Sequence, residues 1–450
     1  MASPTNLDAQ ACDVLREAAH PLVGGERDHD GLMALIGEAR FVLIGEASHG
    51  THEFYRERAR LTRRLIAEKG FQAVAIEGDW PDAYRVNRYV RGLSDDVSAE
   101  AALAGFRRFP TWMWRNTVVT GFVDWLREFN DTRSEADKVG FYGMDLYSLH
   151  SSMNAVLQYL GAADPTAVRL AKERYGCFDL YGSESQVVYG LMAGLGTSPG
   201  CEREVISMLV DLRRRAQAAA LQGHDDAEEA FDAEQNARLV KNAEAYYRSL
   251  YLSDVSSWNL RDRHMMETLN ELERHLARTA DVAEPKIVVW AHNSHLGDAR
   301  ATERGARGEL NVGQLVRERH GPQTVAIGFS THTGSVTAAT DWDGVAERKL
   351  MHPSLPGSYE HLMHEVGIEH FWLPLRGTRR HAQVLGVPRL QRAIGVIYRP
   401  DTERQSHYDH ARLPEQFDAL IHIDTTRAVE PLERNAEWTP EVPEIYPAGL

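Results

Sequence analysis

The sequence is poor in cysteine. Its 450 residues include only three cysteines, Cys12, Cys177 and Cys201, which are widely separated and odd in number. They form no CxxC pair, so a cysteine-based metal site is not expected. A framework of disulfides, as in small secreted proteins, is not expected either.

The sequence also lacks long apolar runs and an excess of positive charge. No stretch approaches the roughly 18 apolar residues of a membrane-spanning helix. The N-terminal residues MASPTNLDAQACDV show no basic segment followed by an apolar core. The formal net charge is −15 and is spread along the chain, which argues against nucleic acid or a membrane surface as a partner. We therefore expect a soluble, cytoplasmic protein.

What the sequence does contain is an alternation of apolar runs and amphipathic segments. This alternation predicts an α/β fold with a mostly parallel or mixed central sheet flanked by helices. Residues 148–280 are helical in pattern almost throughout, so we expect a large helical insertion between core parts at 1–147 and 281–450. The expected strands lie at 41–45, 73–76, 139–145, within 286–295, and at 324–330, 334–339, 370–375, 392–398 and 417–423.

Four of these strands end on acids or histidines. The endings are Glu46 with His49, then Glu77, then Asp145, and finally His292 with His295. The carboxyl ends of parallel strands meet at one edge of a sheet, and ligands of open α/β sheets bind there. The sequence therefore predicts one polar cluster at this edge.

The first ending has the features of a catalytic elbow. Gly45 and Gly50 bracket it and permit the sharp turn from strand to helix. A histidine held on such a turn beside a carboxylate suits a general base acting on water. We expect His49 to be this base, with Glu46 and Glu77 orienting the imidazole or the water, whereas His52 is expected to point elsewhere.

Further polar residues are candidates for the same site. Arg58 lies in the helix after the elbow, where it could bind an oxyanion or instead form a salt bridge to a local acid. Arg261 and His264 share a helix face and, with Asp145, are expected to bind substrate. His292 and His295 could donate to an oxyanion, or bind Zn, Mn or Fe together with the acids. No HExxH or other specific ligand spacing supports the metal alternative.

A serine nucleophile is not expected. Residues 196–200 match the G-x-S-x-G pattern, but no strand precedes them, and that motif requires a strand-to-helix turn. Ser48 does lie in such a turn beside His49. Adjacent side chains on a turn of this kind usually diverge.

Three separated blocks resemble the erythromycin esterase family, which includes proteins described as succinoglycan biosynthesis proteins. The blocks are GEASHGTHEFYRER at 45–58, AVAIEGDWPDAY at 73–84 and VVWAHNSHLGDAR at 288–300. The resemblance implies an α/β core with a helical part, distantly similar to the ChaN haem-binding and TIKI/TraB groups. It therefore also leaves open a non-enzymatic protein that binds a small, haem-like ligand.

The resemblance further implies a chemistry. Characterised members of the family are antibiotic-resistance esterases that hydrolyse the macrolactone of erythromycin. A histidine acts as general base on water, without a covalent intermediate or an obligatory metal. By position, His49 matches that base. The family's other site residues match Glu46, Glu77, Arg58, His292 and His295.

A substrate other than the macrolides is favoured, and an erythromycin-type macrolide is the open alternative. The blocks at 258–265 and 334–349 resemble an uncharacterised branch of the family. We therefore expect a hydrolase that needs no cofactor and cleaves a small-molecule carboxylic ester, lactone or acyl sugar. A metal-dependent hydrolase using the same histidines and acids is the alternative.

Overall fold

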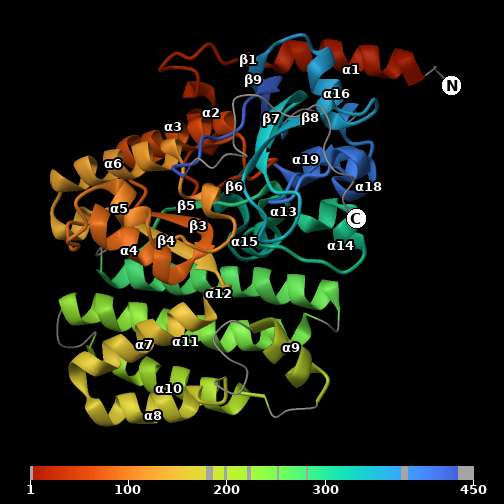
Figure 1. Ribbon diagram of the computed structural model, residues 1–450. Helices are drawn as coiled ribbons and strands as arrows, with labels where there is room; N and C mark the ends of the chain where they lie inside the picture. The colour runs from red at the N-terminus through yellow and green to blue at the C-terminus, as the bar shows by residue number, and fades with distance from the viewer. Residues whose placement is uncertain are drawn as a thin grey trace. The chain divides into compact units, whose positions relative to one another are not determined.

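A computed structural model describes residues 4–178, 186–196, 200–219, 224–250, 253–279, 282–376 and 384–433 (Figure 1). By its internal contacts the chain divides into two compact units. Unit 1 comprises Met1–Val74, Asp96–Phe129 and Lys286–Leu450. Unit 2 comprises Ala75–Asp95 and Asn130–Pro285.

The centre of unit 1 is a mixed β-sheet. Its strands run in the order β1 (His20–Pro21), β9 (His370–Pro374), β12 (Ala419–Ile423), β6 (Thr324–Ser330), β2 (Phe41–Ile44) and β5 (Ile287–Trp290). β2 is parallel to β5 and β6, and β6 is parallel to β12. β9 runs antiparallel to β12 and β1. Every residue of β2, β5 and β6 is buried, as is typical of strands with both faces covered. The expected mixed α/β sheet is confirmed.

Helices accompany this sheet along unit 1. The most important for the site is α3 (His52–Lys69), which begins directly after the elbow. α3 ends at Gly70, whose φ of 67° is left-handed and whose amide donates to the Leu65 carbonyl, as its sequence predicts. The longer helices of unit 1 besides α3 are α1 (Pro4–Ala18), α6 (Thr117–Asp131) and α15 (Val312–His320). Its shorter helices include α2 (Asp30–Ile36), α5 (Ala99–Leu103), α13 (Asn293–Leu296) and α16 (Tyr359–Glu365).

Two smaller sheets complete the strands of unit 1. The strand expected at 334–339 is β7 (Thr333–Ala338), which is antiparallel to β8 (Glu347–Met351) and parallel to β13 (Thr425–Thr426). β10 (Arg389–Arg392) pairs with β11 (Tyr408–Ala411) in an antiparallel ladder.

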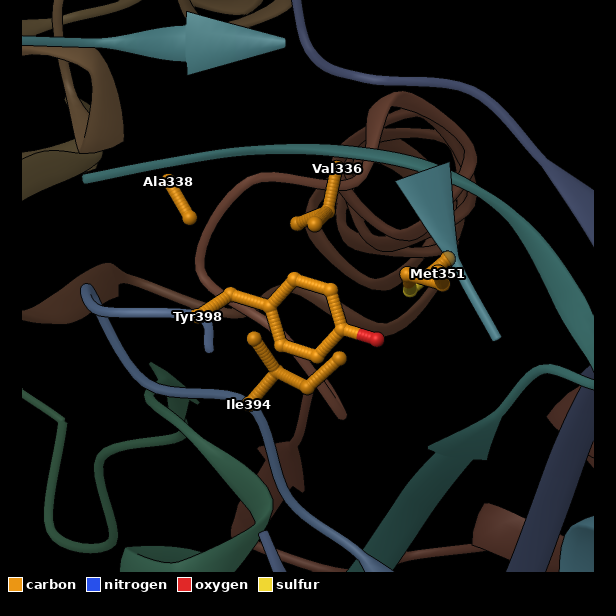
Figure 2. Close-up of a cluster of buried hydrophobic side chains, with 5 residues drawn as sticks. All are labelled: Val336, Ala338, Met351, Ile394 and Tyr398. Atoms are coloured by element: carbon orange, nitrogen blue, oxygen red, sulfur yellow. The ribbon is translucent and has the colours of Figure 1, made fainter. Parts of the chain in front are cut away.

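The prediction of a strand at 392–398 is wrong, because the strand in this region, β10, ends at Arg392. Beyond Arg392 the segment makes only single bridging pairs, Ile394 with Ser48 and Ile397 with Ala339. Its apolar residues are buried nevertheless. Figure 2 shows Ile394 and Tyr398 packed against Val336, Ala338 and Met351 of β7 and β8. The apolar pattern of this segment therefore reflects the burial of its side chains and does not indicate a strand of a sheet.

Unit 2 is predominantly helical. It holds β4 (Gly140–Asp145) beside β3 (Ala73–Asp79), most of which belongs to this unit. Among the described residues from 149 to 279 there are helices and no strand, which confirms the large helical insertion. In Figure 1, α7, α8, α10 and α11 pack on one another. The helices of unit 2 are α4 (Trp80–Val90), α7 (Leu149–Ala163), α8 (Pro165–Tyr175), α9 (Gln186–Gly194), α10 (Glu202–Ala219), α11 (His224–Ser249) and α12 (Asp254–Thr279).

Two of the three cysteines are paired in unit 2, in a single bond and not in a framework. A disulfide joins Cys177, which follows α8, to Cys201, which directly precedes α10. The two residues are 24 apart in sequence, and their Cα atoms lie 5.8 Å apart. Their pairing depends on how α8 and α10 pack, which no spacing motif in the sequence reports.

None of the helices within the described ranges combines the length and the apolar character that crossing a membrane requires.

Candidate active site

The elbow between β2 and α3 is held by close backbone contacts. The Gly45 amide donates to the Ile327 carbonyl of β6 at 2.8 Å, and a Cβ at Gly45 would collide with the Asn293 side chain. The Gly50 carbonyl accepts from the Thr337 amide at 3.0 Å, and a Cβ at Gly50 would collide with the Thr337 backbone. Glycine is therefore required at both ends of the elbow, because the Asn293 side chain and the Thr337 backbone lie too close for a Cβ.

Glu46, His49 and Arg58 form a buried polar chain at the elbow. His49 Nδ1 lies 2.9 Å from Glu46 Oε1, and Arg58 Nη1 lies 3.0 Å from Glu46 Oε2. The side chains of Glu46 and Arg58 are 1% and 0% exposed. Of the two alternatives for Arg58, the salt bridge to a local acid is the one observed. An ionised carboxylate only accepts hydrogen bonds, so His49 carries its proton on Nδ1 and presents the Nε2 lone pair.

Arg58 is also enclosed by aromatic rings. Its guanidinium carbon lies 4.6 Å from the ring centre of Tyr55, 4.8 Å from that of Trp290 and 5.9 Å from that of Trp114. Tyr55 in turn donates its hydroxyl to the His49 carbonyl at 2.9 Å. The cation is thus fixed by cation–π contacts as well as by Glu46, and this fixes the carboxylate beside His49.

His292 lies next to His49. It follows β5, and its ring centre is 4.9 Å from that of His49. His292 Nδ1 lies 2.8 Å from Ser294 Oγ and accepts from the Ser294 amide at 3.2 Å. Asn293 joins the same end of the sheet, because its amide donates to the Glu46 carbonyl and its side chain donates to the Phe329 carbonyl, both at 2.8 Å. His295 is buried in the short helix α13, where its amide donates to the His292 carbonyl.

The predicted residues of unit 2 form a second group. Arg261 donates from Nε and Nη2 to the two oxygens of Asp145, at 2.9 and 2.6 Å, and from Nη2 to Glu77 at 2.7 Å. Its guanidinium carbon lies 5.0 Å from the ring centre of Tyr147. One cation therefore holds two carboxylates, in a bidentate and a single contact.

The charges of this group are mutually supporting. Burial opposes the ionised form of Asp145, but Arg261 overcomes that effect and lowers the pKa of the carboxyl. Burial likewise opposes the charged guanidinium of Arg261, yet Asp145, Tyr147 and Glu77 raise its pKa well above the usual value.

His264 lies in the same unit and is buried. Its Nδ1 lies 2.8 Å from the Asn242 side-chain nitrogen, which also donates to Glu267. Desolvation by burial lowers the pKa of His264 to about 4, although Glu267 and Asp145 act in the opposite direction. His264 is therefore a neutral imidazole at physiological pH that accepts a hydrogen bond from an amide.

The predicted site residues thus fall into two groups, one in each unit. Unit 1 brings together Glu46, His49, Arg58 and His292, and it buries His295 close by in the chain. Unit 2 brings together Glu77, Asp145 and Arg261, with His264 one helical turn after Arg261. The roles assigned to both groups stay predictions.

Other elbow residues have local partners. His52 Nε2 lies 2.7 Å from Arg427 Nη2, and burial together with Arg427 lowers the pKa of His52. The Ser48 hydroxyl pairs with the Thr51 hydroxyl. Residues 197–199 of the G-x-S-x-G pattern lie outside the described residues. Within the described ranges, no group of three or more histidines, cysteines, aspartates or glutamates is arranged to hold a metal ion.

Sequence reasoning missed several residues that support this site. Tyr55 is three residues before Arg58 on α3, a spacing that signals a shared helix face. Ser294 follows His292 by two residues, as a helix-capping partner can. Trp114 and Trp290 gave no signal beyond core packing, because they reach Arg58 from separate parts of the chain.

The family model for erythromycin esterase matches residues 66–426, which is most of the chain. The protein belongs to the erythromycin esterase family. This membership supports hydrolase activity.

Individual relatives of the family are distant. Erythromycin esterase type II of Escherichia coli is 23% identical over 420 residues, covering 90% of this chain and 93% of that protein. A crystal structure of a succinoglycan biosynthesis protein matches with a TM-score of 0.73 and 21% identity, over 95% of this chain and 100% of that one. A mutant of the erythromycin esterase EreC in its open conformation matches with a TM-score of 0.62 and 18% identity, over 89% of this chain and 94% of that one. At these identities the solved structures show a shared fold.

Proposed function

We propose that this protein hydrolyses a carboxylic ester or lactone with a water molecule that His49 activates. The observation that carries the proposal is the contact of His49 Nδ1 with Glu46, whose other oxygen faces Arg58. It leaves Nε2 of a buried imidazole as a base of fixed orientation, which is what general-base catalysis requires.

The reaction then proceeds in two steps. His49 Nε2 takes a proton from water as the water oxygen attacks the carbonyl carbon, and the electron pair of the C=O bond moves to oxygen. When the resulting tetrahedral intermediate collapses, the ester C–O bond breaks and the departing alkoxide takes the proton back from His49. Glu46 stabilises the imidazolium that exists between these steps, and Arg58 keeps Glu46 in place.

The remaining predicted residues complete the proposal. His292 and His295 stabilise the oxyanion and the leaving group. Glu77 orients the water, and Asp145, Arg261 and His264 take part in substrate binding. The support for the second set is the ion-paired arrangement in unit 2, where Arg261 holds Glu77 and Asp145 in fixed positions.

The substrate is proposed to be a small-molecule ester other than erythromycin. The family model and the E. coli relative support ester hydrolysis. The relative is only 23% identical, so its substrate is not carried over to this chain. A panel of p-nitrophenyl esters, simple lactones and erythromycin therefore belongs in the first assay. We expect turnover of p-nitrophenyl esters and little or none of erythromycin.

The mechanism is tested with His49→Ala. We expect turnover to fall by at least roughly a hundredfold, the usual contribution of a general base. His52→Ala is the matched control, because His52 lies on the same elbow but contacts Arg427, and it should retain activity. Ester turnover that survives in His49→Ala would contradict the mechanism. Activity that depends on a stoichiometric metal and is lost on chelation would favour the metal-dependent alternative.

A further inference from the structure

His49 and His292 have different hydrogen-bond partners on the same ring atom. His49 Nδ1 faces the Glu46 carboxylate at 2.9 Å, and His292 Nδ1 faces the Ser294 backbone amide at 3.2 Å. A carboxylate accepts a hydrogen bond, whereas a backbone N–H can only donate one. The two neighbouring imidazoles are therefore directed towards opposite tautomers.

The contact with Ser294 determines the state of His292. Because the Ser294 amide points its hydrogen at Nδ1, that nitrogen holds its lone pair and the neutral ring carries its proton on Nε2. The Ser294 hydroxyl lies 2.8 Å from the same nitrogen and can donate to it in this tautomer. A proton on Nδ1 would face the amide hydrogen, so the doubly protonated ring is disfavoured by the same geometry.

The position of Ser294 is itself fixed. The Asn311 side chain donates to the Ser294 carbonyl at 2.8 Å and also to the Gly297 carbonyl. Asn311 is the N-cap of α15, where its oxygen accepts from the Gln314 amide at 2.9 Å. The turn after His292 is thus tied to a helix, and His292 cannot readily exchange its partner.

We infer that Ser294 is a positioning residue that keeps His292 a neutral donor through Nε2–H, the complement of His49, whose Nε2 carries no hydrogen. This inference rests on the proposed function. In the proposed reaction, His292 gives a hydrogen bond to the developing oxyanion and transfers no proton, because loss of Nε2–H from a neutral ring would create an imidazolate. His49 alone takes the proton from water and returns it to the alkoxide, so one histidine accounts for both proton transfers.

The tautomer is measured directly by ¹H–¹⁵N NMR of histidine side chains in the full-length protein, with the signals of His292 assigned by their loss in His292→Gln. We expect Nε2 to be the protonated, pyrrole-type nitrogen and Nδ1 to be pyridine-type. A His292 protonated on Nδ1, or on both nitrogens at neutral pH, overturns the inference.

Kinetics test what Ser294 does in turnover. Ser294→Ala removes the hydroxyl and keeps the amide, and we expect kcat to fall about fivefold, the factor for a hydrogen bond of roughly 1 kcal/mol. KM should change little, and Ser294→Thr should restore kcat. The matched control is Ser354→Ala, which removes a hydroxyl 2.6 Å from Nδ1 of another histidine, His332, and should leave kcat unchanged.

The pH profile separates a hydrogen-bond donor from a proton donor. If His292 stays neutral, the pH profile of kcat has a single limb that ends in a plateau, because only one histidine takes and returns a proton in the reaction. A bell-shaped profile whose alkaline limb disappears in His292→Gln would assign His292 as a proton donor and overturn the inference. Absence of ester turnover with the expected tautomer present would instead count against the proposed function alone.

Discussion

Arg58 and Glu46 form an ion pair that is almost completely excluded from water. Their side chains are 0% and 1% exposed, with Nη1 and Oε2 3.0 Å apart. Removing one member of such a pair leaves an uncompensated buried charge, which costs more than the pair itself contributes. The Glu46 carboxylate contacts both Arg58 and His49. A change at Glu46 should therefore affect the stability of unit 1 and the protonation state of His49 together.

The first prediction concerns Glu46→Gln. The variant leaves the Arg58 cation without its carboxylate, so we expect the free energy of unfolding to fall by roughly 3 kcal/mol. It also replaces the carboxylate that stabilises the His49 imidazolium with a neutral amide, so kcat should fall by at least about a hundredfold. Urea unfolding and ester turnover measure the two effects.

The control for this prediction is Glu53→Gln. Glu53 lies in the first turn of α3 and pairs with Arg427, whose side chain is largely exposed. Water screens such a pair, so we expect a smaller loss of stability and little change in kcat. A Glu46→Gln enzyme with normal kcat would show that the carboxylate does not assist His49.

The second prediction concerns Arg261→Met in unit 2. This change leaves Glu77 and Asp145 close together without their shared cation, and we expect a loss of roughly 3–5 kcal/mol in unfolding free energy at pH 7. Asp145 has a lowered pKa in the folded protein, so its stabilising effect is present above its ordinary value and is lost as the pH falls below it. The difference in unfolding free energy between wild type and Arg261→Met should therefore become smaller below about pH 4.

Arg263→Met is the matched control for this experiment. Arg263 lies on α12 two residues after Arg261, and its side chain is exposed. We expect less than about 0.5 kcal/mol of change, as for most surface substitutions. Equal effects of the two substitutions at every pH would contradict the special position of Arg261.

Local patterns in the sequence predicted the elbow well. The apolar run before Glu46, the bracketing glycines and the cap at Gly70 each depend on neighbouring residues, so the chain itself carries the signal. The polar endings of the strands were likewise readable, because parallel strands deliver their carboxyl ends to one edge.

The surroundings of Arg58 were not predictable in the same way. Tyr55 comes from α3, Trp114 from the segment before α6, and Trp290 from the last residue of β5. Their meeting depends on tertiary packing, and each tryptophan alone reads as a core residue. The strand expected over 393–398 was wrong for a related reason. Its apolar side chains are buried, but its backbone makes only scattered bonds, to Ala47 in the elbow, to Ala339 and to His407.

The third prediction concerns the pH dependence of stability through His264. Burial lowers its pKa in the folded protein from 6.5 to about 4. The unfolded chain therefore binds a proton near pH 6.5, whereas the folded protein does so only near pH 4. Stability from this group is complete above pH 6.5 and is lost as the pH falls through this window, by up to roughly 3 kcal/mol at about 1.4 kcal/mol per pKa unit.

His264→Gln tests this prediction, because glutamine does not titrate and its oxygen can accept from Asn242. Urea unfolding at a series of pH values should show a shallower loss of stability in the variant between pH 6.5 and 4. The stability difference from wild type should shrink over the same range. Parallel curves for the two proteins would show that His264 is not the group whose protonation is linked to unfolding.

The fourth prediction separates the two roles of glycine at the ends of α3. At Gly50 a Cβ would meet the Thr337 backbone, which is held by a hydrogen bond to Gly50 itself. At Gly70 the φ is 67°, but nothing lies within 4 Å of a Cβ. We expect Gly70→Ala to cost about 1 kcal/mol of unfolding free energy through its backbone conformation and to leave turnover intact.

Gly50→Ala must displace β7 or the elbow, and we expect turnover to fall at least about tenfold because displaced catalytic groups lose their alignment. Thermal unfolding and ester kinetics of both variants check this difference, and a Gly50→Ala enzyme as active as Gly70→Ala would mean that the elbow tolerates movement that the proposed geometry does not allow.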